Sequence, residues 1–301
     1  MDCIITIKNP VNDNLGSIVQ SLLDALAQLN PINTGDKVVL DLSRLKFIHP
    51  LLILPICAFL NKSDFLVSGI DYKVNNTIEG YLKTIHFPES FTALSHPNWH
   101  DYLSVFKTKS YLPICQIPID FQNTRLREDL LTVFENILLH QLQISGQMVA
   151  VIKYLISEAM DNIVEHSGVS KGWIMVQNFP QKGFLDVCII DTGLGLLGSY
   201  QKFNFPDIET DDQAIYQAVN GNSTKQLAIT RGYGIDTSRK MLVDGLKGKY
   251  FLFSGAAFYI YTGEIEQIIP LERINNWNGT VLALRIPQSL PIGFDYIKYL
   301  E

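Results

Sequence analysis

The chain has 301 residues, of which 47% are hydrophobic and 18% charged, and its formal net charge is −6 at pH 7. This composition can bury a large core and therefore excludes global disorder. Because single cores stop growing near roughly 250 residues, the length favours two domains. Nucleic-acid-binding proteins usually carry a basic surplus, so the acidic balance argues against nucleic acid as a partner.

The cysteines and the apolar segments bear on the compartment. Cys3, Cys57, Cys115 and Cys188 each lie in an apolar run, and none pair at metal-ligand or redox spacing. We therefore expect buried free thiols in a reducing cytoplasm. The most apolar window, residues 51–60, is too short to span a bilayer, and the N-terminus lacks the features of a signal peptide. The sequence thus predicts a soluble cytoplasmic protein that does not enter a membrane.

The first hundred residues alternate between strand-like and helix-like patterns. Strands and helices are predicted in turn at residues 3–8, 16–29, 37–42, 50–60, 71–75 and 80–85. Asn30 and Pro31 end the first helix, and Pro50 suits the first turn of the second. This alternation favours a small α/β layer domain, which we place at residues 1–105.

Residues 86–111 have no clear periodicity and are predicted to form a linker or an edge segment. A second domain is predicted at residues 106–301. Its expected elements are a strand at 111–118, helices at 123–142 and 146–166, strands at 172–177 and 184–190, a loop-rich region at 191–232, a helix at 234–244, and strands at 250–254, 257–262 and 280–286. No internal repeat or low-complexity tract is present.

The first candidate site lies on the second long predicted helix. Glu158 and Asn162 are four residues apart, so they share one helix face, next to an apolar face that carries Ala159 and Ile163. An Asn oxygen can ligate Mg²⁺, and a carboxylate can orient or deprotonate water. Polar pairs at this spacing more commonly form a solvated face, so the pair alone does not identify a site.

A second candidate follows the predicted strand at residues 184–190, which runs into Asp191, Gly193 and Gly195. A carboxylate at the end of a buried strand can accept a hydrogen bond from the amino group of adenine. The glycines allow a tight turn and a close approach to a ligand. The spacing differs from the dinucleotide motif G-x-G-x-x-G, because Gly198 comes one residue too late. For D-x-G-x-G alone, an ordinary strand-to-loop turn is the commoner explanation.

A third candidate combines hydroxyls, cations and paired glycines before a predicted helix. The residues concerned are Ser223, Thr224, Lys225, Arg231, Gly232 and Gly234. Backbone N–H groups at a helix start, with Lys or Arg nearby, make a phosphate site, and the stretch between the glycines is suited to act as a lid. A surface loop with a glycine turn is the alternative. Finally, Asn278-Gly279-Thr280 leads into the last predicted strand and by itself indicates only the start of a hairpin.

In this order the segments resemble the four sequence boxes of the GHKL ATPase superfamily. The boxes are a helix with E-x-x-x-N, a strand end with D-x-G-x-G, a G-x-G before a helix, and G-T at a strand start. The superfamily includes gyrase-type topoisomerases, MutL-like proteins, heat-shock chaperones and sensor histidine kinases. The resemblance covers residues 130–287. The variants E-x-x-D-N, N-S-T-K and R-G-Y-G-I look closest to the stand-alone histidine-kinase-like and anti-sigma-like ATPase domains of bacteria.

The resemblance implies an α/β sandwich of the α+β class, with a mixed sheet covered by helices on one face, that binds ATP and Mg²⁺. It implies that Glu158 orients water, that Asn162 ligates Mg²⁺ and that Asp191 holds adenine with the help of Thr280. It also implies nucleotide loops shaped by Gly193, Gly195, Gly232 and Gly234, with Ser223, Thr224, Lys225 and Arg231 near the phosphates. We interpret His166 as a structural helix-end histidine, and Asp161 and Glu165 either as a solvated face or as residues that support the metal ligands from behind.

The N-terminal domain resembles STAS domains, the fold of anti-sigma factor antagonists. The resemblance rests on residues 38–48 followed by an apolar helix, and it covers residues 1–100. STAS regulators place a phosphorylatable Ser at the start of that helix, but Ile48-His49-Pro50 has no hydroxyl here. We therefore expect a degenerate STAS-like domain for docking or dimerisation, and a generic α/β core without a regulatory role is the alternative.

Three functions stay open at this point. The first is a nucleotide switch with slow ATP hydrolysis, read by a protein partner or by a second copy of the chain. The second is a serine protein kinase of the anti-sigma type, with Glu158 as the base and a STAS-like partner as the acceptor. The third is a non-catalytic module in which the nucleotide is structural. An autophosphorylating histidine kinase is disfavoured, because His140 lacks the phosphoacceptor context and lies too near the E-x-x-x-N helix.

Overall fold

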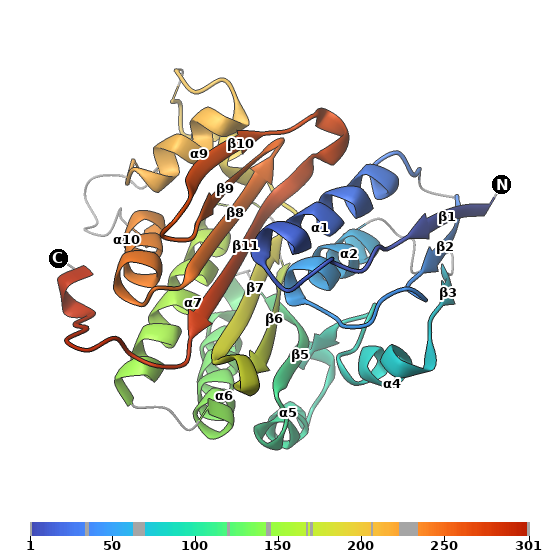
Figure 1. Cartoon of the computed structure of the whole chain (residues 1–301), viewed down its shortest axis with the longest axis horizontal. Coiled ribbons are helices and arrows are strands. Elements are labelled where there is room, and N and C mark those ends of the chain that lie inside the picture. Colours follow the sequence, from blue (N-terminus) through green and yellow to red (C-terminus); the bar gives the residue numbers. More distant parts are fainter. Residues whose placement is uncertain are drawn as a thin grey trace.

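The computed structural model describes residues 2–33, 36–62, 70–118, 121–142, 146–166, 168, 171–205, 207–222 and 234–299. Within these residues the chain forms a three-stranded parallel sheet and an eight-stranded mixed sheet (Figure 1). The fold class is therefore mixed α and β, as predicted. No helix in the described ranges is long and apolar enough to cross a membrane.

The N-terminal part alternates strands and helices. Its elements are β1 (Asp2–Thr6), α1 (Leu15–Leu29), β2 (Lys37–Asp41), α2 (Pro50–Lys62), β3 (Ile70–Lys73) and α4 (Asn76–Thr84). The strands pair in parallel in the order β1-β2-β3, with α1 and α2 as the crossovers that parallel pairing requires. Asn14 begins α1 by accepting the N–H of Ser17 at 2.9 Å. Because α2 is apolar on every side, it can be stable only when buried all round.

The rest of the chain builds the large sheet. Its elements are β4 (Phe91–Thr92), α5 (Trp99–Ser104), β5 (Tyr111–Pro118), α6 (Thr124–Leu142), α7 (Gly146–His166), β6 (Lys171–Phe179), β7 (Phe184–Asp191), α8 (Gly195–Lys202), α9 (Asp211–Val219), α10 (Gly234–Lys240), β8 (Lys249–Gly255), β9 (Ala257–Tyr261), β10 (Glu266–Pro270) and β11 (Trp277–Pro287). The strand order is β10-β9-β8-β11-β7-β6-β5-β4. Neighbouring strands are antiparallel except β4 and β5, which are parallel.

Two stretches contain more regular structure than their sequences indicate. Residues 86–111 contain α5 and the edge strand β4, and Phe91, Trp99 and Phe106 are buried in the core beside α6 and α7. The region expected to be loop-rich contains α8 and α9. A capping box between Thr210 and Gln213 begins α9, so this helix had a local start signal that the neighbouring glycines obscured.

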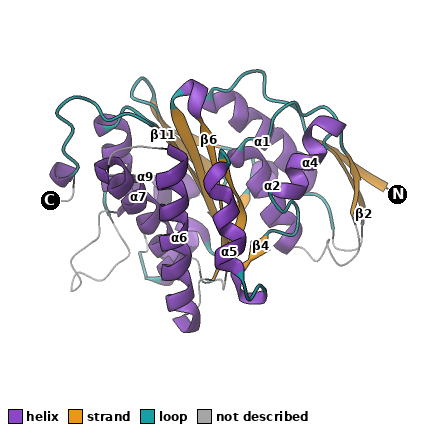
Figure 2. Ribbon diagram, turned by 90° about the horizontal axis from the view of Figure 1, so that it is seen from below, coloured by secondary structure: helices purple, strands orange, loops and turns teal. Residues whose placement is uncertain are grey.

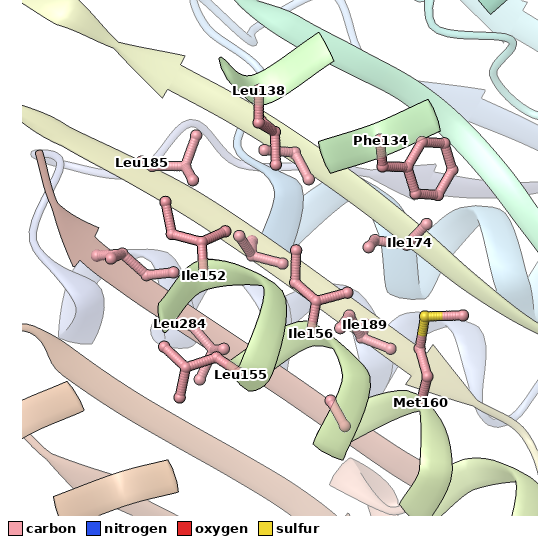
Figure 3. Packing of buried hydrophobic residues seen from close by; sticks show 14 of the residues in the cluster. Phe134, Leu138, Ile152, Leu155, Ile156, Met160, Ile174, Leu185, Ile189 and Leu284 are labelled. Atoms are coloured by element: carbon pink, nitrogen blue, oxygen red, sulfur yellow. The ribbon is translucent and has the colours of Figure 1, made fainter. Parts of the chain in front are cut away.

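One face of the large sheet is covered by α6, α7 and α10. Figure 2 shows α6 and α7 on one side of the sheet and α1, α2 and α4 on the other. Figure 3 shows how apolar side chains of α6 and α7 pack against those of the strands. The labelled residues are Phe134, Leu138, Ile152, Leu155, Ile156, Met160, Ile174, Leu185, Ile189 and Leu284. This is the helix-covered face that the family resemblance implies.

The opposite face is also covered, which differs from the expected sandwich with helices on one side. Trp173, Ile190, Phe251 and Val281 point away from α7 and share one core with α1 and α2. The molecule therefore has four layers: the small sheet, α1 with α2, the large sheet, and α6 with α7 and α10 (Figure 1). Both faces need a cover because the central strands carry apolar side chains on both sides, instead of alternating apolar with polar residues.

The cysteines match their prediction closely. Cys57, Cys115 and Cys188 are buried, Cys3 is half-buried, and all four are free thiols. Burial raises the pKa of the Cys57, Cys115 and Cys188 thiols well above its ordinary value. These side chains therefore stay protonated and serve as small apolar core residues.

Candidate functional site

A pocket lies between α7 and the large sheet and contains side chains from well-separated parts of the chain. Its lining residues are Ala159, Asn162, Ile163, Ile189, Asp191, Gly195, Leu196, Ile235, Tyr250, Leu252, Thr280 and Leu282. Four of them, Asn162, Asp191, Gly195 and Thr280, come from three of the four segments that the sequence singled out, namely the E-x-x-x-N helix, the D-x-G-x-G strand end and the G-T strand start. The structure thus brings these candidates together in one place.

The register of two neighbouring strands sets the polar end of the pocket. Asp191 is the last residue of β7, and Val281 of β11 pairs with Ile190, which places Thr280 beside Asp191. Asp191 is only 1% exposed. Its Oδ1 accepts the N–H of Gly193 at 2.8 Å, so the carboxylate also holds the turn that leaves the strand. A carboxylate and a hydroxyl are therefore fixed side by side at the end of an apolar slot.

Two glycines allow the backbone to close around this end. Gly279 has φ of +123°, and a Cβ there would overlap the carbonyl oxygen of Asp191. Gly195 has φ of +67°, and a Cβ there would lie 2.8 Å from Oγ of Ser254. Both positions combine a backbone conformation that favours glycine with a close neighbour, so larger residues would force the two loops apart.

Ser254 on β8 connects these two loops and is a residue that the sequence analysis missed. Its Oγ accepts the N–H of Leu196 at 2.8 Å and donates to the carbonyl oxygen of Gly279 at 3.0 Å. The side chain is 1% exposed. No local sequence signal marks Ser254, because its role depends on the pairing of β8 with β11, which places it opposite Thr280.

The walls of the slot are apolar and come from two layers. Ala159 and Ile163, one turn apart on α7, face the side chains of Ile189, Leu252 and Leu282 on three adjacent strands. The small side chain of Ala159 leaves space between helix and sheet. A slot with two apolar walls and a polar end is suited to a flat heterocycle that carries hydrogen-bonding groups at one edge.

Tyr250 lies on the same strand as Ser254, four residues before it, and also lines the pocket. It is 1% exposed, and burial raises the pKa of its phenol above the ordinary value, so the hydroxyl is neutral. Within the described part of the chain, no hydrogen bond to this hydroxyl is formed. A buried hydroxyl without a protein partner can still bond to a ligand or to water in the pocket.

At the other end of the pocket α10 begins directly against the E-x-x-x-N pair. A Cβ on Gly234 would overlap Oε2 of Glu158 and would lie 3.8 Å from Nδ2 of Asn162. Both side chains are half-buried, whereas Asp161 is exposed as predicted. Gly234 therefore lies closely against this pair, and the predicted residues Glu158, Asn162 and Gly234 are neighbours.

Several candidates cannot be placed. Ser223, Thr224, Lys225, Arg231 and Gly232 lie outside the described residues, as do the side chains of Glu165 and His166. His140 is described: it is exposed on α6, and its Nδ1 lies 2.7 Å from the carbonyl oxygen of Asn136. It does not line the pocket.

The described oxygen donors near the pocket are too few to hold Mg²⁺ without other ligands. Among the described residues, no three His, Cys, Asp or Glu side chains converge to hold a metal ion. Glu158 and Asn162 offer oxygen donors one helical turn apart. Mg²⁺ bound with a nucleotide needs only one or two protein ligands, since phosphates and water complete its shell. The residues present therefore fit Mg²⁺ that arrives with a nucleotide better than a metal caged by protein alone.

No protein-family model matches this chain, and no curated protein is recognisably similar to it in sequence. A function is therefore inferred from the pocket and its residues.

Proposed function

We propose that the chain binds ATP with Mg²⁺ in the pocket between α7 and the sheet, and acts as a GHKL-type nucleotide switch with slow ATP hydrolysis. The observation that carries this proposal is the convergence of Asn162, Asp191, Gly195 and Thr280 on one pocket. These residues lie in separate segments, and their shared location is what a nucleotide site built from ordered sequence boxes requires.

The polar end of the slot favours adenine over guanine. The buried carboxylate of Asp191 accepts a hydrogen bond from the exocyclic amino group of adenine, and Thr280 supplies a neighbouring hydroxyl. Guanine has a carbonyl oxygen at the corresponding position, and this oxygen repels a carboxylate. A buried polar group that loses its hydrogen bond, whether on the protein or on the base, costs about 1–3 kcal/mol. ATP should therefore bind about one to two orders of magnitude more tightly than GTP.

The opposite end supports a role for Glu158 and Asn162 near the phosphates. Bound Mg²⁺ would neutralise phosphate charge, with the amide oxygen of Asn162 as a protein ligand. Glu158 projects from α7 against Gly234. In this position its carboxylate would orient a water molecule and accept a proton from it. Nucleotide occupancy is then read by a protein partner or by a second copy of the chain.

The proposal is tested by titrating the protein with ATP and GTP in the presence of Mg²⁺ and by measuring phosphate release. ATP should bind and GTP should bind far more weakly. Asp191→Asn should weaken ATP binding by at least about tenfold, because an amide presents a donor to the adenine amino group. Glu158→Ala should retain binding and lower turnover by about 100-fold or more. Failure of the wild-type protein to bind ATP would overturn the proposal, and unchanged turnover in Glu158→Ala would remove only the role of that carboxylate.

A further inference from the structure

Helix α1 lies along β11 on the face of the large sheet opposite the pocket, and hydrogen bonds connect the two elements at both ends (Figure 1). Just before α1, the carbonyl oxygen of Asp13 accepts a hydrogen bond from Nη1 of Arg285 at 2.7 Å. Just after α1, Asn30 contacts the turn that leads into β11. The N-terminal part of the chain is therefore hydrogen-bonded to β11 near its end and to the turn before its start.

The contact of Asn30 is a two-pronged clamp. Its Nδ2 donates to the carbonyl oxygens of Ile274 and Asn276, each at 2.8 Å. The two acceptors belong to the turn immediately before β11. A single carboxamide thus uses both of its hydrogens to hold a turn that is more than 240 residues away along the chain.

Three contacts lead from this turn to the polar end of the pocket. Nδ2 of Asn276 donates to Oδ1 of Asn278 at 2.8 Å. Nε1 of Trp277 donates to the carbonyl oxygen of Asp191 at 3.0 Å. Gly279 packs directly on the backbone of Asp191, as its lack of space for a Cβ indicates. Together with the register of β7 and β11, the position of the turn therefore contributes to how Thr280 and Asp191 lie relative to each other.

We infer that Asn30 is a positioning residue for the pocket: by clamping the turn before β11 it holds Trp277, Gly279 and Thr280 against Asp191 in the geometry that binds the base. This inference rests on the proposed function for the identity of the ligand. Without the clamp the turn and the first residues of β11 gain freedom, and binding must then order them again. The N-terminal part would in this way influence nucleotide affinity from the far side of the sheet.

The test compares Asn30→Ala with Asn75→Ala in the full-length protein. Asn75 serves as the control, because its Nδ2 also donates to two carbonyl oxygens at 2.8 Å, those of Ser43 and Leu45, within the N-terminal part, while its Oδ1 caps the start of α4. Asn30→Ala should raise the Kd for ATP by about five- to tenfold, the size of a modest coupling between sites. KM should rise with it while kcat is retained. Asn75→Ala should leave Kd and KM unchanged even if its thermal stability falls as much.

A second readout needs no ligand. The indole N–H resonance of Trp277, assigned with Trp277→Phe, reports the hydrogen bond to Asp191. Asn30→Ala should shift this resonance, and Asn75→Ala should not. A Kd for ATP within about twofold of wild type in Asn30→Ala would overturn the inference. If the wild-type protein does not bind ATP, the proposed function fails, and the Trp277 resonance alone decides whether Asn30 positions this edge: an unchanged resonance refutes it.

Discussion

The two faces of the large sheet are made by the same strands and have opposite properties. On β7, Ile189 lines the pocket below α7, whereas its neighbour Ile190 is packed against the N-terminal helices. On β8, Leu252 likewise lines the pocket, whereas its neighbour Phe251 packs in the core shared with the N-terminal helices. Alternation along each strand thus gives one face with a pocket and one face that is close-packed.

The difference comes from the helices that cover each face. α1 and α2 present large apolar side chains, and α2 is buried on nearly all sides. α7 instead presents the small Ala159 and the polar Asn162 to the pocket. One face is therefore close-packed, while the other gives up some contacts around Ala159 and leaves an open pocket.

The comparison is tested most strongly by matched substitutions on β7. Ile190→Ala should lower the free energy of unfolding by about 4 kcal/mol, because the close-packed face cannot collapse onto the cavity. Ile189→Ala should cost about 2 kcal/mol, since the pocket already removes some of its contacts. Both side chains are at most 1% exposed, so exposure does not explain the difference. Urea denaturation measures both values, and equal losses would contradict the contrast between the faces.

The close-packed face also contains a polar group whose protonation should matter. His49 is 3% exposed between Phe47 and Phe179, and burial lowers its pKa from 6.5 to about 4. Above pH 6.5 it is neutral in both states. As the pH falls from 6.5 to about 4, the unfolded chain takes up a proton that the folded chain does not. The free energy of unfolding should therefore fall by about 3 kcal/mol over this range.

His49→Phe should remove this loss, so that the stability of the variant depends less on pH between 6.5 and 4 than that of wild type. Urea denaturation at a series of pH values gives the difference. Burial also lowers the pKa of His86, but that contribution is present in both proteins and cancels. A variant as acid-sensitive as wild type would show that His49 is not the group responsible.

The elements of this fold were largely predictable from periodicity, but the arrangement of the faces was not. The helix pattern around Glu158 and the strand ending at Asp191 marked one side of the pocket. Ser254, Trp277 and Tyr250 gave no signal, because their roles depend on which strands pair and in which register. Strands that are apolar on both faces do not reveal which side faces a pocket. The all-round apolar character of α2 was the available hint that a second layer covers the sheet.

On the pocket face, Ser254 offers a test of intermediate size. Ser254→Ala removes one acceptor and one donor between the loops of Gly195 and Gly279, so the free energy of unfolding should fall by about 1–2 kcal/mol. ATP affinity should fall by about threefold or more as the two loops loosen. Ser238→Ala is the control, because among the described residues its buried Oγ has no hydrogen-bond partner. Thermal and urea denaturation measure stability, and titration with ATP measures affinity. Equal losses of stability and affinity in the two variants would disprove the role of Ser254.

Two tyrosines on neighbouring strands separate ligand binding from folding stability within one face of the sheet, and one of them gives the smallest expected effect on stability. Tyr250 and Tyr259 lie on adjacent strands and are each 1% exposed. The hydroxyl of Tyr259 donates to Glu266 at 2.7 Å and accepts from Arg239 at 3.1 Å, so Tyr259→Phe should lower the free energy of unfolding by about 1–2 kcal/mol and leave ATP affinity unchanged. Tyr250→Phe removes a hydroxyl that bonds to no described residue, so it should change the stability of the free protein by less than about 0.5 kcal/mol.

If the Tyr250 hydroxyl serves the ligand, directly or through one water, Tyr250→Phe should weaken ATP binding by about three- to tenfold. Titration of both variants with ATP and with purine riboside triphosphate, which lacks the amino group, locates the contact. A loss confined to ATP places the hydroxyl near the amino edge, and an equal loss for both ligands places it near the ring nitrogens. Unchanged binding of both ligands would mean that Tyr250 only fills the floor of the pocket.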